Sequence, residues 1–169
     1  MANPVGRIVN EEVLEERARN LAARGLNGIH RVYVRLMPVA APTEAWLDLE
    51  FHNTVQLAAI LAAIGGGALP HAIFPIAGGS RITAGAAAGQ VRVAQVLAGP
   101  EANQLRLVVP VIGDYSTYTL MVDFALIDPM LSEIAFKFRP ACFNLNCADD
   151  KPMPAAPPPT ITISCEASA

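Results

Sequence analysis

The sequence predicts a mainly β domain, an antiparallel, immunoglobulin-like β-sandwich of about six or seven short strands, with one or two short helices near the N-terminus and a Pro-rich C-terminal tail. Three observations support this fold class. Several short runs alternate between apolar and polar side chains, as half-buried strands do. Glycine and proline divide these runs at fairly even spacing, which favours antiparallel strands in a sandwich or meander. Helical periodicity is confined to two segments in the first half of the chain.

The first patterned segment is a predicted helix that begins after Asn10 and ends at Gly25. Asn10 can cap free helix amides, and Glu11 and Glu12 would lie at the positive end of the helix dipole. Glycine often ends a helix in the left-handed conformation. One apolar face is predicted, formed by Leu14, Ala18, Leu21 and Ala22. Because this face is narrow, we expect the helix to pack on a sheet or on a neighbouring protein.

The next two alternating runs predict strands that pair as a hairpin. They cover residues 29–36 and 45–51. Arg31 and Arg35 point outward from the first strand, and Asp48 and Glu50 point outward from the second. Opposite charges on neighbouring strands can pair across the hairpin. Because we expect these pairs to be exposed, each should contribute only about 0–1 kcal/mol.

The central part of the chain is apolar but does not predict a membrane span. A short apolar helix is expected over residues 53–64, capped by Asn53 or Thr54. Residues 54–80 carry no Asp, Glu, Lys or Arg and could cross a bilayer, which takes about 20 apolar residues. Glycine and proline interrupt this segment repeatedly, and much of the rest is alanine, so no spanning helix is expected. No signal peptide is evident, so the expected location is the cytoplasm.

The second half of the chain predicts four further strands. They cover residues 90–97, 103–111, 116–124 and 134–138. Proline cannot donate to a β-ladder, so Pro110 should place its strand at a sheet edge or at a bulge. Asp128-Pro129 predicts a turn, because proline presets the first corner and restricts the residue before it. The two strands on either side of this turn should be antiparallel.

Composition indicates a protein that keeps apolar surface for its partners. Hydrophobic residues make up 53% of the chain and charged residues 16%, whereas an average domain has about 25% charged residues. The net charge of −3 provides no basic surface, so nucleic-acid binding is not expected.

A set of ordered motifs occupies the region before the Pro-rich run. The motifs are GDYSTYTL at 113–120, Asp128-Pro129, Ser132, Phe-Lys-Phe at 136–138 and Cys142 with Cys147, preceded by a weaker Gly-Gly match at 77–82. In this order they resemble the N-terminal region of baseplate assembly proteins, which are wedge-like proteins of contractile injection systems and contractile phage tails. The resemblance implies a structural role through contacts with other baseplate subunits, and it supplies no catalytic residues. It also implies assembly into a particle that can be released from the cell.

The cysteines are the first candidates for a metal site. Cys142 and Cys147 are spaced for a metal or a disulfide, but a structural zinc usually needs four ligands, and no second cysteine pair is present. The other possible ligands lie at unrelated positions, namely Cys165, His30, His52 and His71. Reduced thiols are the default in the cytosol. We therefore expect no metal, and the favoured interpretation of both cysteines is as small apolar residues.

No enzyme signature is evident either. Ser80, Ser116 and Ser132 lack the strained Gly-x-Ser-x-Gly turn of a nucleophilic serine. The paired and tripled glycines lack the strand-loop-helix pattern that holds phosphate. The acidic pairs are more simply explained as a helix cap, a solvated strand face and a linker. The sequence predicts neither an enzyme nor a bound cofactor.

The expected domain covers residues 1–148, and a Pro-rich linker or tail covers 149–169. Proline-rich segments of this kind are extended and form no packed core. Residues 160–169 do not resemble the start of another domain. The chain is therefore expected to be either a truncated N-terminal piece or a domain that acts alone.

A second function class also fits a small β-sandwich. It is a carbohydrate- or peptide-binding module, for which Trp46, Tyr33 and Tyr115 are natural stacking residues. This alternative requires these aromatic side chains to share one surface.

Overall fold

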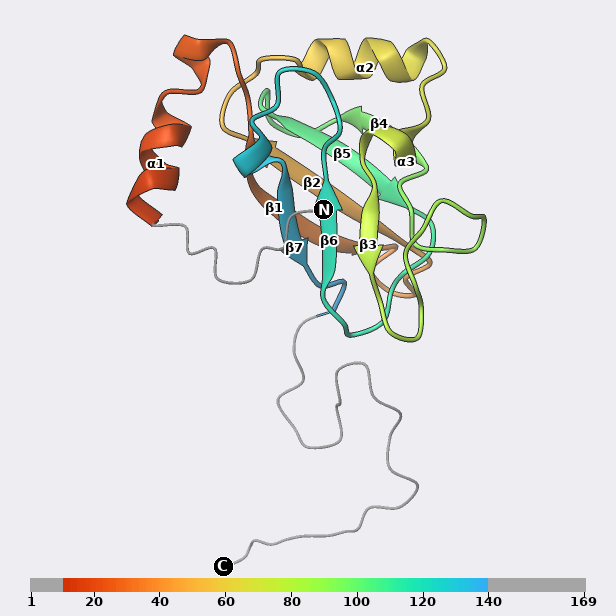
Figure 1. Cartoon of the computed structure of the whole chain (residues 1–169). Coiled ribbons are helices and arrows are strands. Elements are labelled where there is room, and N and C mark those ends of the chain that lie inside the picture. The colour runs from red at the N-terminus through yellow and green to blue at the C-terminus, as the bar shows by residue number, and fades with distance from the viewer. Residues whose placement is uncertain (1–10, 140–169) are drawn as a thin grey trace, which may run out of the picture.

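The computed structural model describes residues 11–139 and shows two antiparallel sheets packed face to face (Figure 1). One sheet has four strands in the order β1-β2-β5-β4, and the other has three in the order β3-β6-β7. The strands are β1 (Ile29–Met37), β2 (Glu44–Phe51), β3 (Ile76–Gly78), β4 (Gln95–Ala98), β5 (Gln104–Val109), β6 (Tyr118–Met121) and β7 (Glu133–Phe136). The helices are α1 (Glu11–Arg19), α2 (Leu57–Gly65), α3 (Pro70–Ile73) and the 3₁₀ turns η1 (Ala22–Arg24) and η2 (Pro129–Leu131).

The strand order is that of an immunoglobulin domain. When the seven strands are lettered A to G along the chain, the sheets read A-B-E-D and C-F-G, which is the constant-type immunoglobulin arrangement. Every pairing within the two sheets is antiparallel. The predicted mainly β, immunoglobulin-like sandwich is therefore confirmed. The short helices α2 and α3 lie between the second and third strands in the chain.

The core lies between the two sheets. It takes alternate residues from the central strands of each sheet, including Leu47, Leu49, Leu105, Leu107, Tyr118 and Leu120, each at most 1% exposed. Helix α2 lies across one end of the sandwich (Figure 1) and contributes Leu57 and Ile60 to this core. Within residues 11–139, no helix is long and apolar enough to span a membrane.

The predicted hairpin forms, but the expectation for Pro110 is wrong. Strands β1 and β2 pair with Val34 opposite Leu47, as the alternation predicted. Strand β5 is not an edge strand, because it pairs with β2 on one side and β4 on the other. It ends at Val109, so the exposed Pro110 lies just beyond the ladder and removes no hydrogen bond from it.

The predicted caps of the central helix are also wrong. Helix α2 begins at Leu57, and its N-cap is Gln56, which has a φ of 72° and makes no capping side-chain bond. The Asn53 side chain instead accepts the Val55 N–H at 2.8 Å and donates to the Leu26 carbonyl at 3.0 Å. Asn53 therefore makes one local bond, to Val55, and one tertiary bond, to Leu26, instead of capping the helix, which starts later.

The first helix is shorter than expected, with its last turn replaced by η1. Gly25 adopts the predicted left-handed conformation and closes η1. Of the predicted apolar face, Leu21 is fully buried, whereas Ala22 is exposed. Strand β3 and helix α3 form within the Gly- and Pro-rich segment, for which no strand was predicted.

Several expectations fall outside residues 11–139. They are the Asn10 cap, the domain boundary at residue 148, the tail at 149–169, Cys142, Cys147 and Cys165.

Candidate functional site

One face of the four-stranded sheet points to solvent and carries aromatic, basic and acidic side chains. Val32 and Val34 of β1 pack against the core, so the residues that alternate with them point the other way. Neighbouring strands continue the same face in register. We call this surface the outer sheet face and define it by Arg31, Tyr33, Arg35, Trp46, Leu97 and Arg106.

Beside the row Arg35-Trp46-Val108-Gln95, a second row of paired residues crosses all four strands of this face. From β1 to β4 it consists of Tyr33, Asp48, Arg106 and Leu97. Tyr33 and Leu97, at the two ends, are 45% and 42% exposed. Asp48, near the middle, is only 2% exposed. The row therefore has a buried acidic centre and exposed ends.

Asp48 is held by two arginines from the strands on either side. Arg106 of β5 contacts both carboxylate oxygens, with Nε at 2.7 Å from Oδ1 and Nη2 at 2.9 Å from Oδ2. Arg35 of β1 adds a third bond, from Nη2 to Oδ2 at 2.7 Å. The hydrogen bond from Arg106 is the main cause that lowers the pKa of Asp48, and Arg35 lowers it further.

The predicted charge pairs across the hairpin are confirmed, but one of them is not exposed. Arg31 Nε lies 3.2 Å from Glu50 Oε1, and Arg35 pairs with Asp48. We expected a solvated acidic strand face, yet Asp48 is buried. Its burial follows from the pairing of β2 with β5, which brings Arg106 against its second side.

Trp46 is held in place by its neighbours. The Arg106 guanidinium carbon lies 4.4 Å from the centroid of the Trp46 ring, which is a cation–π distance. The indole Nε1 donates to Glu44 Oε1 at 2.7 Å. Arg106 therefore links the aromatic ring to the buried carboxylate, and the surface around Trp46 and Asp48 is preorganised.

A second polar cluster lies where the chain crosses from β5 to β6. The hydroxyl of Tyr118, the first residue of β6, accepts the N–H of Asp114 at 3.0 Å and donates to the Ile82 carbonyl. A tyrosine at this position that bonds to backbone a few residues upstream is the tyrosine corner of immunoglobulin-type sandwiches. Tyr118 itself is fully buried. This cluster belongs to the inside of the fold.

The Asp114 carboxylate accepts hydrogen bonds from the backbone of two loops. Its Oδ2 accepts the N–H groups of residues 80, 81 and 82 at 3.2, 2.6 and 2.9 Å. Its Oδ1 accepts both the N–H and the hydroxyl of Ser116. Desolvation alone would raise the pKa of Asp114, but the bonds from Ser116 and the backbone together outweigh it and hold the pKa far below its ordinary value.

The Phage baseplate assembly protein, N-terminal domain, family model matches residues 5–136 of the chain. The chain belongs to this family. No curated protein and no solved structure matches the chain significantly. The resemblance recognised in the sequence is therefore confirmed, and the structure is that of a phage baseplate assembly domain. A structural role in a baseplate follows, with other baseplate components as its partners.

Two of the motifs that resemble the family come together at the tyrosine corner of the baseplate domain. GDYSTYTL and the Gly-Gly segment meet there, because Asp114 bonds to residues 80–82. A side chain at Gly79, whose φ is +90°, would lie within 2.9 Å of the Tyr118 hydroxyl. A side chain at Gly113 would lie within 2.6 Å of both Tyr118 and Phe138. These motifs therefore specify the fold, and both Ser116 and Tyr118 are buried in it.

The outer sheet face of the baseplate domain was only partly predictable. Tyr33 and Trp46 were singled out as aromatic residues, and the structure places both on this face. Tyr115 does not join them, because it lies in the crossing between the sheets, with the Arg139 guanidinium 5.7 Å from its ring centroid. Arg106 was missed, and the signal that could have found it is a single arginine at an outward position of an apolar strand.

The histidines are not all scattered as expected. The rings of His30 and His52 lie 4.6 Å apart, at the start of β1 and just after β2. Desolvation, and then the nearby His30, lower the pKa of His52. Even so, residues 11–139 contain no group of three or more His, Cys, Asp or Glu side chains that could hold a metal ion.

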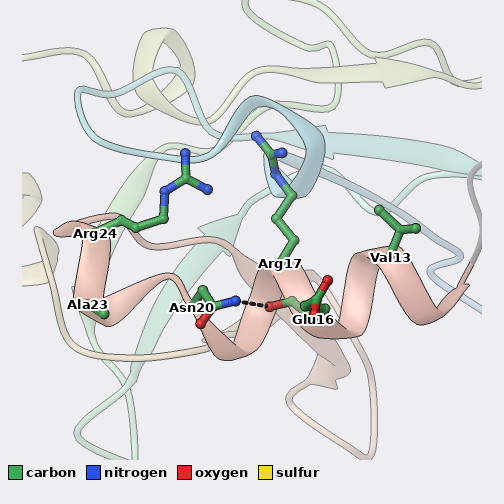
Figure 2. A pocket seen from close by; sticks show the side chains of 6 residues that line it. All are labelled: Val13, Glu16, Arg17, Asn20, Ala23 and Arg24. Carbon is green, nitrogen blue, oxygen red and sulfur yellow. Dashed lines mark hydrogen bonds between the residues drawn. The ribbon is translucent and has the colours of Figure 1, made fainter.

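A shallow hollow lies beside α1 (Figure 2). It is lined by Val13, Glu16, Arg17, Asn20, Ala23 and Arg24. Arg17 extends away from α1 and pairs with the buried Asp128 at 2.6 Å. Asp128 also accepts the N–H of Met130 and so begins η2. The role of Arg17 that the structure supports is to attach α1 to the sandwich.

Proposed function

We propose that this domain joins neighbouring subunits in the baseplate of a contractile phage tail or a related contractile injection system, as part of a wedge-like baseplate protein. The family match is the observation that carries the proposal. The domain acts by shape and by burial of surface, and it is not an enzyme. We further propose that it assembles in the cytoplasm, into a particle that can be released from the cell.

The outer sheet face is the surface best suited to such a contact. Tryptophan, tyrosine and arginine are the residues that most often dominate binding energy at protein interfaces. Here Tyr33, Trp46 and Arg106 lie on one sheet face, and the positions of Trp46 and Arg106 are fixed by hydrogen bonds and by the cation–π contact. A rigid surface loses little conformational entropy when a partner binds. A typical interface buries about 800 Å² on each partner.

The test is co-expression of the full chain with each baseplate subunit encoded beside its gene. We expect a complex that co-purifies and survives size-exclusion chromatography. Replacing Leu97 or Tyr33 by alanine should weaken its affinity about tenfold or more, because both would be buried at the contact. Leu69→Ala is the matched control for Leu97→Ala, since Leu69 is 57% exposed but lies outside the outer sheet face.

Two results would count against the proposal. The baseplate role fails if the folded chain binds none of these subunits. The assignment of the surface fails if Leu97→Ala and Leu69→Ala behave alike. A glycan that binds the chain and is lost in Trp46→Ala would instead favour the carbohydrate-binding alternative. The separation of Tyr115 from Tyr33 and Trp46 weighs against that alternative.

A further inference from the structure

The exposed positive charges of the outer sheet face lie in one line along β1. Arg31 and Arg35 flank Tyr33 on the same side of the strand, about 13 Å apart at the usual rise per residue. Their side chains are 54% and 55% exposed. This line lies on an edge strand of the sheet, where a second protein can approach.

The acids that pair with these arginines lie deeper in the surface. Glu50 is 21% exposed and Asp48 only 2%, so an approaching protein meets the guanidinium groups first. Asp48 is shared between two arginines. The group of Arg35, Asp48 and Arg106 therefore keeps one net positive charge, and the acid that balances it on this face, Glu44, is bonded to Trp46.

Arg35 keeps donors for a ligand. A guanidinium has five N–H donors. Within residues 11–139 the structure pairs Arg35 through Nη2, with Asp48. Its remaining donors can bind a carboxylate, and Asp48 fixes the orientation of the group. Arg31 is tied to Glu50 and to His30, so its exposed guanidinium has fewer donors left than that of Arg35 and plays the supporting part.

We infer that Arg35, supported by Arg31, binds an acidic segment of a neighbouring baseplate subunit, with one Asp or Glu carboxylate at Arg35 and the adjoining residues against Tyr33. This inference rests on the proposed function and specifies the chemistry of the partner. Electrostatic attraction of this kind raises the association rate and weakens as ionic strength rises.

The experiment compares the full wild-type chain with the double variant Arg31→Gln and Arg35→Gln. The probe is each baseplate subunit encoded beside the gene, expressed singly. Binding kinetics are measured at ionic strengths of about 0.01 M and about 0.15 M. The double variant should bind about tenfold or more weakly, mainly through slower association, and should lose most of the salt dependence.

Two further variants make the result specific. Arg19→Gln is the matched control, because Arg19 is an exposed arginine of α1 outside the outer sheet face, and it should bind like the wild type. Arg35→Lys keeps the charge but loses the forked geometry, so it should fall between the wild type and the double variant. The double variant should fold, because Asp48 keeps both bonds to Arg106. If it does not fold, Arg35→Lys decides the question alone.

The outcomes separate the inference from the proposed function. If the wild type binds a subunit and the double variant binds it equally well with the same salt dependence, the inference is wrong and the proposed function stands. If the wild type binds no subunit, both are wrong. If the arginine changes abolish self-association instead, the occupant is a second copy of this chain and the acidic-subunit assignment is overturned.

Discussion

Two aspartates, the half-buried Asp114 and the buried Asp48, use an ionised carboxylate in different ways. Both have a lowered pKa and both are held by several hydrogen bonds. The donors to Asp114 are backbone N–H groups and the Ser116 hydroxyl, all within loops of the fold. The donors to Asp48 are arginine side chains that reach the surface. The first arrangement fixes the backbone, and the second fixes a surface.

The surroundings of the two carboxylates differ in the same way. Near Asp114, the ring of Tyr118 packs at 5.9 Å from Phe136 and at 5.0 Å from Phe138. All three rings are almost completely buried. Near Asp48, the aromatic residues are half-buried or exposed and lie beside arginines. Changes at Asp114 should therefore act on folding, and changes at Asp48 should act on binding.

The largest effect on stability is expected for Asp114→Ala. This change leaves the N–H groups of residues 80–82 and Ser116 without their acceptor, and it should lower the free energy of unfolding by about 3 kcal/mol. Urea denaturation of the full chain measures it. Asp123→Ala, at an exposed aspartate outside the cluster, should change stability by less than about 0.5 kcal/mol.

The same variant has a pH signature. The pKa of Asp114 is lower in the folded chain than its unfolded value of 3.8. The ionised carboxylate therefore stabilises the fold fully above pH 3.8, and this stabilisation is lost as the pH falls through the folded pKa. The difference in free energy of unfolding between the wild type and Asp114→Ala should therefore become smaller as the pH falls below 3.8. A gap that is constant with pH would show that the ionised carboxylate is not what stabilises the two loops.

A smaller effect is expected for Tyr118→Phe. The ring stays in the core, but the Asp114 N–H and the Ile82 carbonyl lose their partner, at a cost of about 2 kcal/mol. Thermal or urea unfolding measures it. Because Tyr118 and Asp114 belong to one cluster, the double variant with Asp114→Ala should be less destabilised than the sum of the two single changes. Simple additivity would mean that the two side chains act independently.

Asp48→Asn should affect stability less and binding more. Arg35 is half exposed and can be solvated again, so we expect a loss of about 1.5 kcal/mol in the free energy of unfolding. The two arginines lose their fixed orientation, and affinity for the baseplate partner should fall about tenfold. Isothermal titration calorimetry of the folded variant separates the two effects. If Asp48→Asn strongly destabilises the fold but leaves the affinity unchanged, Asp48 acts on folding as Asp114 does, and the contrast between the two aspartates is wrong.

The smallest effect concerns His52. Its pKa is lowered by desolvation and then by His30, while Glu50 opposes the shift. The unfolded chain therefore binds more protons than the folded one, and stability is lost as the pH falls below 6.5 through the folded pKa. We expect a loss of less than about 1 kcal/mol, seen as a lower Tm at mildly acidic pH. His52→Gln should remove this decrease of Tm with falling pH. If the variant keeps the decrease, another group causes it.

The sequence predicted the sandwich because its strands alternate clearly. Strands β2, β5 and β6 bury alternate residues, and β1 alternates half-buried with exposed ones, so a period of two identified all four without any tertiary information. Strand β3 was missed because it has three residues, of which Ala77 and Gly78 are exposed and only Ile76 is buried. The caps of α2 were wrong because Asn53 bonds to Leu26 and Val55, a choice decided by packing.

The candidate site was less predictable, because it depends on which strands are neighbours. Alternation placed Arg31 and Arg35 on an outward face, and charge suggested Asp48 and Glu50 as their partners. The burial of Asp48 depends on Arg106, which is distant in sequence and becomes its neighbour only when β2 pairs with β5. The same pairing brings Arg106 onto Trp46. Single-strand patterns do not contain this information.

The row of Tyr33, Asp48, Arg106 and Leu97 takes one residue from each strand of its sheet. The row joins two pairs that are distant in the chain, Tyr33 with Asp48 and Leu97 with Arg106, so a copy in which β2 and β5 have not paired cannot present the whole row. A subunit that binds this row would select completed domains and leave misfolded copies behind. In a particle built from many parts, such a contact would act as quality control at the moment of incorporation.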